Sequence, residues 1–545
     1  MKAIQSGSPA STQLLYNPRL NKFPQDQLNF ENDHFRLLLD GYVLNHQPLL
    51  KACPGQRLAE IILNAYQTGG MGAVLNLLRG SFVIAILEKA SQTACIANDM
   101  LSKKPLFYLQ TGDRLLADSS FLSLVEDAKA AGLPLTMNPI GVEEMIQRCA
   151  FLGSDTYVQE IHFLERFQYL QLTPEGISLK TYEYQPSQEI PQDENALLER
   201  MDALFTEACA MAVQKNKAQG YRQVFTLSAG MDSRCAYLKS LPFLTEGKPL
   251  GITYGAAGCM ELQIAETLAR KYPCDLVKSE VDPALFVQNR ENLLSSNEGM
   301  MYYAGTTGLF QLLNTLDTAS FGLVITGLSG GEIMGDLGKF GSDEELYHEL
   351  LSGIVTDEKA LQARMEQLMR ESTPYNEYVC YQDIRTCNNF AYTTRHLFET
   401  FSPFLYEDLF LLLVKVPQES KSFRRLYAKW YLKSIGDPTP TSCFQGPVKV
   451  TSRTSPSQLV KGVFRRLRRM LRIQGKWDMN PMEIWVEKHP ENKSYMDTTL
   501  EDDLTLIAAH NSGFADMLRQ RYQNADGDTK LRILTVSGMM KRIWA

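Results

Sequence analysis

Hydrophobic residues in the first third of the chain fall in short runs separated by polar and turn-forming residues, a pattern typical of β-strands. Two stretches with a helical spacing of apolar residues, 58–66 and 72–78, interrupt these runs. The pattern predicts strands at 35–39, 81–87, 94–97, 105–109 and 167–172.

The pattern changes after the stretch 185–193, whose two prolines, three glutamines and two acids are typical of a linker. Beyond it, strands and helices alternate, which predicts a parallel sheet with a ligand site at the carboxyl ends of its strands. From about residue 343 the pattern is mostly helical. The expected elements are a helix at 197–213, a strand at 224–227, a strand at 250–254, a helix at 260–271 and a strand at 323–326.

The alternation of strands and helices predicts an α/β protein, and the length supports two domains, expected at 1–185 and 186–545. A chain of 545 residues is too long for one typical hydrophobic core. Its content of 44% hydrophobic and 21% charged residues is that of a globular protein. The sequence has no run of 18 apolar residues and no signal-peptide pattern, so we expect a soluble, cytoplasmic protein.

Charge and cysteine usage narrow the functional classes. A net charge of −7 argues against nucleic acid as the main partner. The ten cysteines include no Cys-X-X-Cys pair and no metal-ligand spacing, so we expect reduced packing residues.

The segment 461–476 is locally different, with seven basic residues and apolar residues at helical spacing. It predicts a basic amphipathic helix. One interpretation is a surface helix that packs its apolar stripe on the domain; the other is contact with a membrane surface or an acidic substrate. The stripe is narrow and lacks tryptophan, which favours the first.

The most informative segment is 223–234, where an apolar strand ends in a small-residue turn followed by Asp232 and Ser233. Ala229 and Gly230 allow the backbone to approach a ligand closely. A helix that begins near Met231 would direct its free N–H groups at an anion, and Asp232 could hold Mg²⁺. The turn is not a Walker loop, because no Gly-Lys-Ser/Thr follows it. An ordinary strand-turn-helix connection is the alternative.

Residues 228–233, Ser-Ala-Gly-Met-Asp-Ser, resemble the Ser-Gly-Gly-X-Asp-Ser loop of the ATP pyrophosphatases and, within them, of the asparagine synthetase family. The one change, Ala229 for glycine, adds a methyl group where that loop approaches phosphate. The resemblance implies a PP-loop domain of the adenine nucleotide α-hydrolase-like fold with a helical C-terminal part, with ATP and Mg²⁺ as cofactors and Asp232 as the metal ligand. The implied ATP-binding residues are Leu227, Ser228, Ala229, Gly230, Met231, Asp232, Ser233, Tyr254, Thr326 and Gly327.

Two further segments resemble catalytic motifs of that family. Residues 326–332 resemble Thr-Gly-Asp/Glu-Gly-X-Asp-Glu, but Leu328 and Gly331 replace two of its acids, the second of them a Mg²⁺ carboxylate. The segment from 399 resembles Glu-X-Arg-X-Pro-Phe-Leu-Asp, and basic residues after it could stabilise departing pyrophosphate. The resemblance implies catalytic roles for Glu332, Glu399, Arg425 and Lys429.

The N-terminal part resembles the glutamine-hydrolysing domain of the same family, which has an N-terminal-nucleophile (Ntn) hydrolase fold, an αββα sandwich. The similar segments are 40–45, 78–82 and 98–108. That domain uses an N-terminal cysteine, whereas this chain begins Met1-Lys2 and has no cysteine before Cys53. Asp40 also replaces an asparagine of the oxyanion hole, and its negative charge would repel an oxyanion. We therefore expect a domain without glutaminase activity.

The combined interpretation is an ATP-dependent amide-forming ligase that activates a carboxylate as an acyl-adenylate. Its expected partners are a small-molecule or peptide carboxylate and an amine or ammonia, with no nucleic acid. Two alternatives stay open: an adenylating enzyme that uses another nucleophile, and a catalytically silent nucleotide-binding scaffold. The altered residues Leu328 and Gly331 favour the scaffold, and the retained Asp232 and Ser233 do not.

Overall fold

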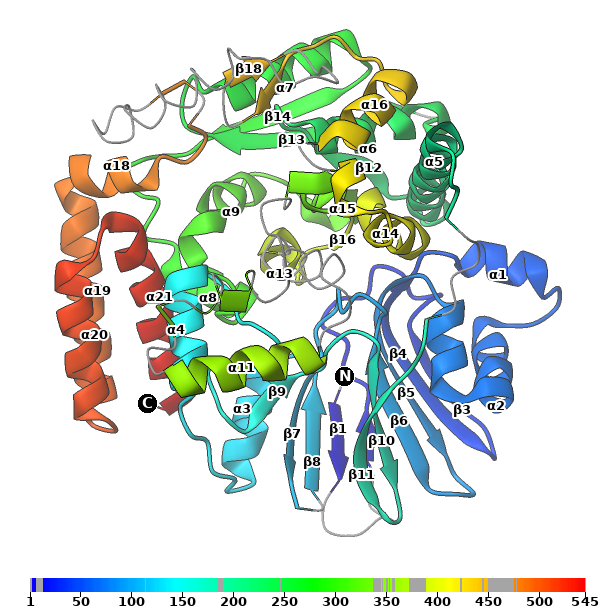
Figure 1. The fold of residues 1–545 in the computed structure, drawn as a ribbon, viewed down its shortest axis with the longest axis horizontal. Helices are drawn as coiled ribbons and strands as arrows, with labels where there is room; N and C mark the ends of the chain where they lie inside the picture. Colours follow the sequence, from blue (N-terminus) through cyan, green and yellow to red (C-terminus); the bar gives the residue numbers. More distant parts are fainter. Residues whose placement is uncertain are drawn as a thin grey trace. The chain divides into compact units, whose positions relative to one another are not determined.

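The computed structural model divides the chain into two compact units (Figure 1). The first unit contains Met1–Val142, Phe151–Glu189 and Tyr406–Asp408, and the second contains Glu143–Ala150, Ile190–Leu405 and Leu409–Ala545. The structure describes residues 2–5, 13–112, 114–184, 190–245, 247–336, 345, 347–348, 351, 353–354, 358–371, 389–421, 424–443, 446–448, 475–476 and 478–544. The predicted basic helix at 461–476 therefore lies almost entirely outside the described residues.

The first unit contains two mainly antiparallel sheets. The five-stranded sheet has the order β2-β1-β8-β7-β9, and the six-stranded sheet has the order β11-β10-β6-β5-β4-β3. The strands are β1 (Lys2–Gln5), β2 (Gln13–Leu15), β3 (Leu28–Glu31), β4 (Phe35–Val43), β5 (Gly80–Glu88), β6 (Thr93–Asn98), β7 (Phe107–Thr111), β8 (Arg114–Asp118), β9 (Ile161–Phe163), β10 (Gln168–Thr173) and β11 (Gly176–Thr181).

Strand β4 shows how the layers of this unit are formed. Leu38 packs in a core shared with Leu115 of the other sheet, whereas Leu37 and Leu39 pack in a second core with helix α2 (Leu58–Leu77). Successive side chains of a strand point to opposite faces, so an uninterrupted apolar run is buried on both sides. On the outer side of the five-stranded sheet, Phe107 of β7 contacts Phe121 of α3 (Phe121–Ala130), which gives a helix-sheet-sheet-helix order.

The five strands predicted in this part are confirmed as β4, β5, β6, β7 and β10, with ends that differ by a few residues. The two predicted helical segments form one element, α2, which is interrupted at Gly69 and Gly70, where Gly70 has a φ of 66°. The short strands β1, β2, β3, β8, β9 and β11 were not predicted.

The second unit is built on a parallel sheet of order β14-β13-β12-β15-β16, which confirms the predicted parallel arrangement. Val224, Ile252 and Val324 face one core together with Leu309 and Leu312 of α9. Two strands were not predicted, because β14 is mostly polar and β16 has only three residues. The elements are α5 (Glu194–Ala218), β12 (Arg222–Thr226), α6 (Met231–Ser240), β13 (Leu250–Gly255), α7 (Met260–Lys271), β14 (Asp275–Glu280), α8 (Arg290–Asn297), α9 (Thr307–Leu313), β15 (Phe321–Ile325) and β16 (Glu399–Phe401).

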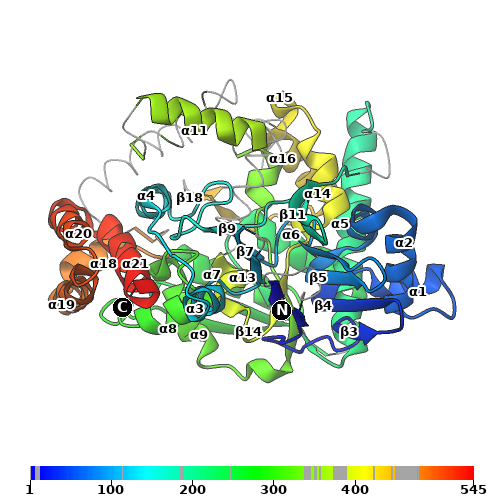
Figure 2. The same cartoon turned by 90° about the horizontal axis from the view of Figure 1, so that it is seen from below.

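The described part of the chain after residue 343 is mostly helical, as predicted, and α19, α20 and α21 pack side by side (Figure 2). No helix among the described residues is long and apolar enough to cross a membrane. The remaining elements are α1 (His46–Ala52), α4 (Pro139–Arg148), α11 (Glu358–Glu371), α13 (Asn389–Thr394), α14 (Glu407–Val414), α15 (Gln418–Lys421), α16 (Arg425–Ser434), β17 (Thr441–Cys443), β18 (Gly446–Val448), α18 (Met482–Lys488), α19 (Pro490–Ala508), α20 (Ser512–Asn524) and α21 (Gly527–Trp544), with short 3₁₀ turns at Leu241–Phe243, Tyr303–Thr306, Thr318–Ser320 and Pro403–Leu405 and a π-turn at Glu332–Asp336.

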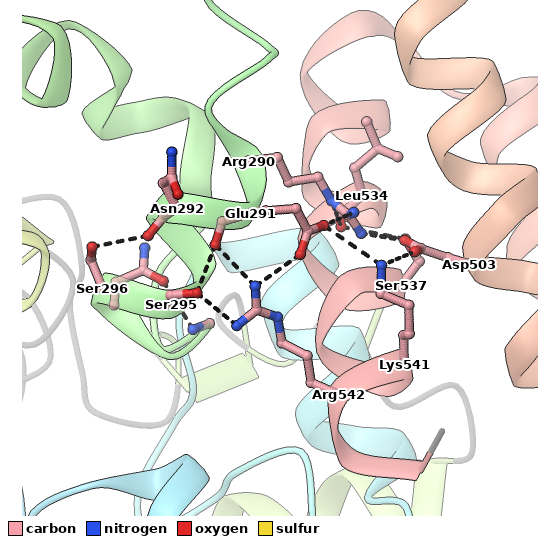
Figure 3. A network of polar contacts seen from close by, with 12 residues as sticks. Arg290, Glu291, Asn292, Ser295, Ser296, Asp503, Leu534, Ser537, Lys541 and Arg542 are labelled. Carbon is pink, nitrogen blue, oxygen red and sulfur yellow. Dashed lines mark hydrogen bonds and ion pairs between the residues drawn. The ribbon is translucent and has the colours of Figure 1, made fainter.

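A buried ionic network attaches the C-terminal helices to α8 (Figure 3). The fully buried guanidinium of Arg290 donates to the carbonyl of Leu534 at 2.9 Å, to the Asp503 carboxylate, and to Ser537 Oγ at 3.2 Å. Lys541 Nζ lies 2.9 Å from the other oxygen of Asp503. Charges buried to this degree are tolerated only when they are paired and hydrogen-bonded.

Candidate functional site

The predicted nucleotide loop lies at the carboxyl end of β12 and leads into α6. The Ser228 and Ser233 hydroxyl oxygens lie 2.7 Å apart, and the Ser228 amide donates to Ser233 Oγ at 3.1 Å. Gly230 occupies the N-cap of α6, and its amide donates to Ser228 Oγ at 3.0 Å. A glycine has no side chain with which to cap the helix, so the first turn of α6 presents backbone N–H groups to an anion.

Ala229 is fully buried and packs against Ile264 and Leu268 of α7. The resemblance of residues 228–233 to the ATP-pyrophosphatase loop implies that this methyl group lies where the loop approaches phosphate. In the structure the methyl group contributes to a hydrophobic cluster with α7 instead. The Ala229 amide is engaged within the protein, because it donates to Glu261 Oε1 at 2.9 Å. A phosphate oxygen that binds this amide must therefore replace a carboxylate.

Asp232, in the first turn of α6, is approached by two later segments of the chain. Tyr427 of α16 donates a hydrogen bond of 2.5 Å to Asp232 Oδ1. The turn after β15 passes so close to the same oxygen that a Cβ atom at Gly330 would lie 2.7 Å from Oδ1. A Cβ atom at Gly327 would lie 2.1 Å from the Ser233 backbone nitrogen, so both glycines are required for the close approach of the turn to α6.

The turn after β15 is fixed by its neighbour β16. The Thr326 amide donates to the Phe401 carbonyl at 2.8 Å, and Ser402 Oγ donates to the Leu328 carbonyl at 2.7 Å. Ser329 adopts a left-handed conformation with φ 62°, which is unfavourable for a residue other than glycine. Its buried hydroxyl has no hydrogen-bond partner within the described part of the chain.

The structure brings some of the predicted catalytic residues toward the loop and not others. Glu332 begins the π-turn that follows Gly330 and Gly331, and it is partly buried. Glu399 pairs in register with Leu323, two positions before the carboxyl end of β15, so it does not begin the turn that contacts Asp232. Ser402, which the sequence did not indicate, is the residue whose hydroxyl binds this turn, at the Leu328 carbonyl.

On α16, Tyr427 contacts Asp232, whereas the predicted catalytic residues of this helix are Arg425 and Lys429. Lys429 Nζ lies 2.5 Å from Glu194 of α5, and Arg425 is exposed at the first position of α16. Positions two apart on a helix are separated by about 200° around its axis, so Tyr427 and Lys429 lie on different sides. The predicted roles of Arg425 and Lys429 at pyrophosphate stay predictions.

Tyr254, at the carboxyl end of β13, packs against α9. A Cβ atom at Gly308 would lie 2.4 Å from the Tyr254 ring. Burial, and then the nearby Glu261 carboxylate, raise the pKa of the Tyr254 hydroxyl to about 12. The phenol is therefore neutral near pH 7, and its ring packs against α9.

The described residues contain no cluster of three or more acidic, histidine or cysteine side chains that could enclose a metal ion. They fit a Mg²⁺ ion that takes one carboxylate, Asp232, and completes its shell with phosphate oxygens and water, as this ion commonly does in phosphate sites. Ser329, whose buried hydroxyl has no hydrogen-bond partner among the described residues, belongs to the turn that approaches Asp232.

In the first unit the residues of the predicted glutaminase motifs lie on β4, β5 and the loop after β6. Asp40 of β4 is buried, and its Oδ2 lies 3.5 Å from Lys104 Nζ. Asp99 accepts the amides of Lys103 at 3.0 Å and Lys104 at 2.9 Å. Burial, partly offset by Lys103 and these amides, raises the pKa of Asp99 to about 6. An ionised Asp40 can only accept hydrogen bonds, so it cannot donate to an oxyanion as an asparagine does.

No residue with a thiol occupies β1, which reads Lys2-Ala3-Ile4-Gln5. The described cysteines of the first unit are Cys53, which caps α1, and Cys95 of β6. Burial raises the pKa of the Cys95 thiol, which is the opposite of what a nucleophile requires.

Comparison with known proteins assigns a class to this part of the chain. Residues 25–183 match the family model described as a glutamine amidotransferase domain, so this segment is similar to domains of that type. Among individual proteins, the asparagine synthetase [glutamine-hydrolyzing] of Gallus gallus is 27% identical over 113 residues, which cover 20% of this chain and 18% of that protein. The chain thus matches less than a fifth of the length of this relative.

Two solved structures are also similar. An allosteric regulatory enzyme of purine biosynthesis has 11% sequence identity and a TM-score of 0.21, and the match covers 47% of this chain and 62% of that chain. The glutamine phosphoribosylpyrophosphate (PRPP) amidotransferase from B. subtilis, complexed with ADP and GMP, has 11% identity and a TM-score of 0.20, with 78% of this chain and 82% of that chain covered.

Proposed function

We propose that the second unit binds ATP with Mg²⁺ and joins a carboxylate to an amine or to ammonia, as an AMP-forming carbon-nitrogen ligase of the asparagine synthetase type. The observation that supports this most directly is the position of Asp232, in the first turn of a helix that follows a parallel strand and under the turn after the adjacent strand β15. Ligands of open parallel sheets bind at this edge.

In this proposal the N-terminal N–H groups of α6 bind the β- and γ-phosphates, and Asp232 holds the metal ion. Bound Mg²⁺ would neutralise the phosphate charge. Tyr254, Thr326 and Gly327 line the nucleotide side, and Glu332 is the acid that remains on the turn. The α-phosphorus is then open to the substrate carboxylate, which displaces pyrophosphate and gives an acyl-adenylate that the amine attacks. The protein contributes orientation and charge stabilisation.

We propose further that the first unit does not hydrolyse glutamine. Strand β1 carries no thiol, Cys95 is buried with a raised pKa, and Asp40 cannot donate a hydrogen bond when ionised. The amine would then come from solution or from a second substrate. The ligase unit would then need no ammonia from the first unit.

The test is pyrophosphate release from Mg·ATP by the purified protein with a panel of small-molecule and peptide carboxylates, each with and without an amine. Asp232→Asn should lower the rate on the order of 10²-fold or more, as expected for the loss of one charge-stabilising group. Release that is unchanged in a folded Asp232→Asn protein would contradict the assignment. Glutamate release from glutamine should stay at the level without enzyme.

A second candidate function is nucleotide binding without turnover. The observation that favours it is the absence of acids at Leu328 and Gly331, which leaves Asp232 as the carboxylate placed against the turn. The two functions differ in one measurement: a scaffold retains bound ATP intact with every carboxylate and amine, whereas the ligase releases pyrophosphate with at least one.

A further inference from the structure

We propose that Tyr427 is a positioning residue of the Mg·ATP site, which holds the Asp232 carboxylate in the orientation that binds the divalent cation. The inference rests on the proposed function of the second unit. Tyr427 and Asp232 are 195 positions apart in the sequence, and their side chains meet in a hydrogen bond of 2.5 Å. Tyr427 does not need to touch the nucleotide to have this effect.

The direction of the hydrogen bond follows from the protonation of its members. Tyr427 is fully buried, and its phenol is the donor of this pair because an ionised carboxylate can only accept a hydrogen bond. Burial raises the pKa of the Cys235 thiol, whose Sγ lies 3.7 Å from the Tyr427 hydroxyl. Tyr427 therefore donates to Asp232, and the neutral thiol supplies a weak donor to the phenol oxygen. A donor at Asp232 stabilises the ionised carboxylate that a cation requires.

The same carboxylate oxygen is confined sterically. A Cβ atom at Gly330 would lie 2.7 Å from both Oδ1 and Cγ of Asp232, so the backbone of the turn lies close against the carboxylate that accepts the Tyr427 hydrogen bond. With Gly331 in place of a second metal carboxylate, the fixed orientation of Asp232 has a larger effect on affinity. Groups that orient a metal ligand commonly change metal affinity by about 10- to 100-fold.

Helix α16 is attached to α6 at a second point that does not involve Asp232. The buried Arg234 donates to the Tyr431 hydroxyl at 3.1 Å and to the Pro440 carbonyl at 3.0 Å. Tyr431 lies one helical turn after Tyr427, on the same side of α16, and is equally buried. It therefore provides a matched control: Tyr431→Phe removes a buried hydroxyl from the same helix without changing the environment of Asp232.

The experiment is equilibrium dialysis of ATP against the full-length protein over a series of free Mn²⁺ concentrations, for the wild type, Tyr427→Phe and Tyr431→Phe. Circular dichroism confirms the fold of each variant. Tyr427→Phe should raise the Mn²⁺ concentration that gives half-maximal ATP binding by about 10-fold or more, the scale of a lost ligand-orienting contact. Tyr431→Phe should match the wild type. If Tyr427→Phe does not fold, Gly330→Ala displaces the same carboxylate and should produce the same shift.

The outcomes separate the two claims. A wild-type protein that binds no ATP at any Mn²⁺ concentration overturns the proposed function and this inference with it. ATP binding that is lost in Asp232→Asn but has the same Mn²⁺ dependence in the wild type and Tyr427→Phe overturns the inference alone. An equal shift in Tyr427→Phe and Tyr431→Phe also overturns it, because the effect would then come from the packing of α16.

Discussion

Arg290→Met tests the buried network that attaches α19 and α21 to α8 (Figure 3). Methionine keeps an unbranched chain in the same space but removes the charge and the donors. The Leu534 carbonyl then loses its 2.9 Å bond, and Asp503 loses one of its two cationic partners. Removing one member of a buried ion pair typically costs about 3 to 5 kcal/mol. Because Lys541 and Ser537 remain 2.9 and 2.8 Å from Asp503, we expect the lower end, about 3 kcal/mol.

The measurement is hydrogen-deuterium exchange of the amides in α19 and α21, since local opening of these helices reports the network directly. A loss of about 3 kcal/mol corresponds to exchange roughly 100-fold faster, at 1.4 kcal/mol per factor of ten. A control is Arg519→Gln, which removes an ion pair with Glu501 whose side chains are 36% and 55% exposed. Its effect on exchange should be small, because water and salt screen an exposed ion pair.

A double variant, Arg290→Met with Asp503→Leu, sharpens the test because it removes both charges. It should be less destabilised than the sum of the two single variants. Strict additivity, or an Arg290→Met protein that exchanges as slowly as Arg519→Gln, would refute the reasoning.

Three further predictions concern single contacts. Glu261→Gln keeps an acceptor for the Ala229 amide but removes the negative charge that competes with phosphate. ATP should therefore bind about 10-fold tighter in equilibrium dialysis. Weaker binding would show that the charge is needed to hold the loop. Ser329→Gly should raise the free energy of unfolding by about 1 kcal/mol in urea titration, because glycine adopts φ 62° without strain; a destabilised variant would point to a structural role for the hydroxyl. Burial opposes ionisation of Asp408, but hydrogen bonds from Arg79 outweigh burial and lower the pKa of this carboxyl group. The ionised carboxylate therefore contributes fully to stability above the ordinary carboxyl pKa of about 4, and this contribution is lost as the pH falls through the lower folded pKa. The difference in Tm between the wild type and Asp408→Asn should therefore shrink below about pH 4, and a constant difference would contradict this assignment.

The sequence predicts β4, β5 and β6 of the first unit and β12, β13 and β15 of the second because their apolar runs can be distinguished from their surroundings, whereas β8 is missed although it is largely buried. Helix α7, whose apolar residues follow a helical period, begins and ends at the predicted residues, 260 and 271. Strand β14 is missed because its burial is only partial, and β16 because three residues carry no period.

The candidate site is predicted in part. A sequence motif places Asp232 after a strand, but it cannot show that Ala229 turns its methyl group toward α7, since that depends on the packing of two helices. Tyr427 is missed for the same reason. Its proposed role depends on the rotation of α16 about its axis, which the sequence does not show. The sequence instead indicates a nearby basic residue, Lys429, whose side chain contacts Glu194 of α5.

The apolar strand β4 has a consequence for the accuracy of folding. Because it is buried on both faces, a slip of one residue against β5 would only exchange one core for the other, and hydrophobicity alone would not prevent it. Two glycines oppose such a slip. A Cβ atom at Gly41 would lie 2.2 Å from the Ser81 carbonyl oxygen, and one at Gly80 would lie 2.2 Å from that of Tyr42. A slipped pairing of β4 and β5 would place side chains at these points, so steric exclusion at the two glycines disfavours the wrong alignment where hydrophobicity does not.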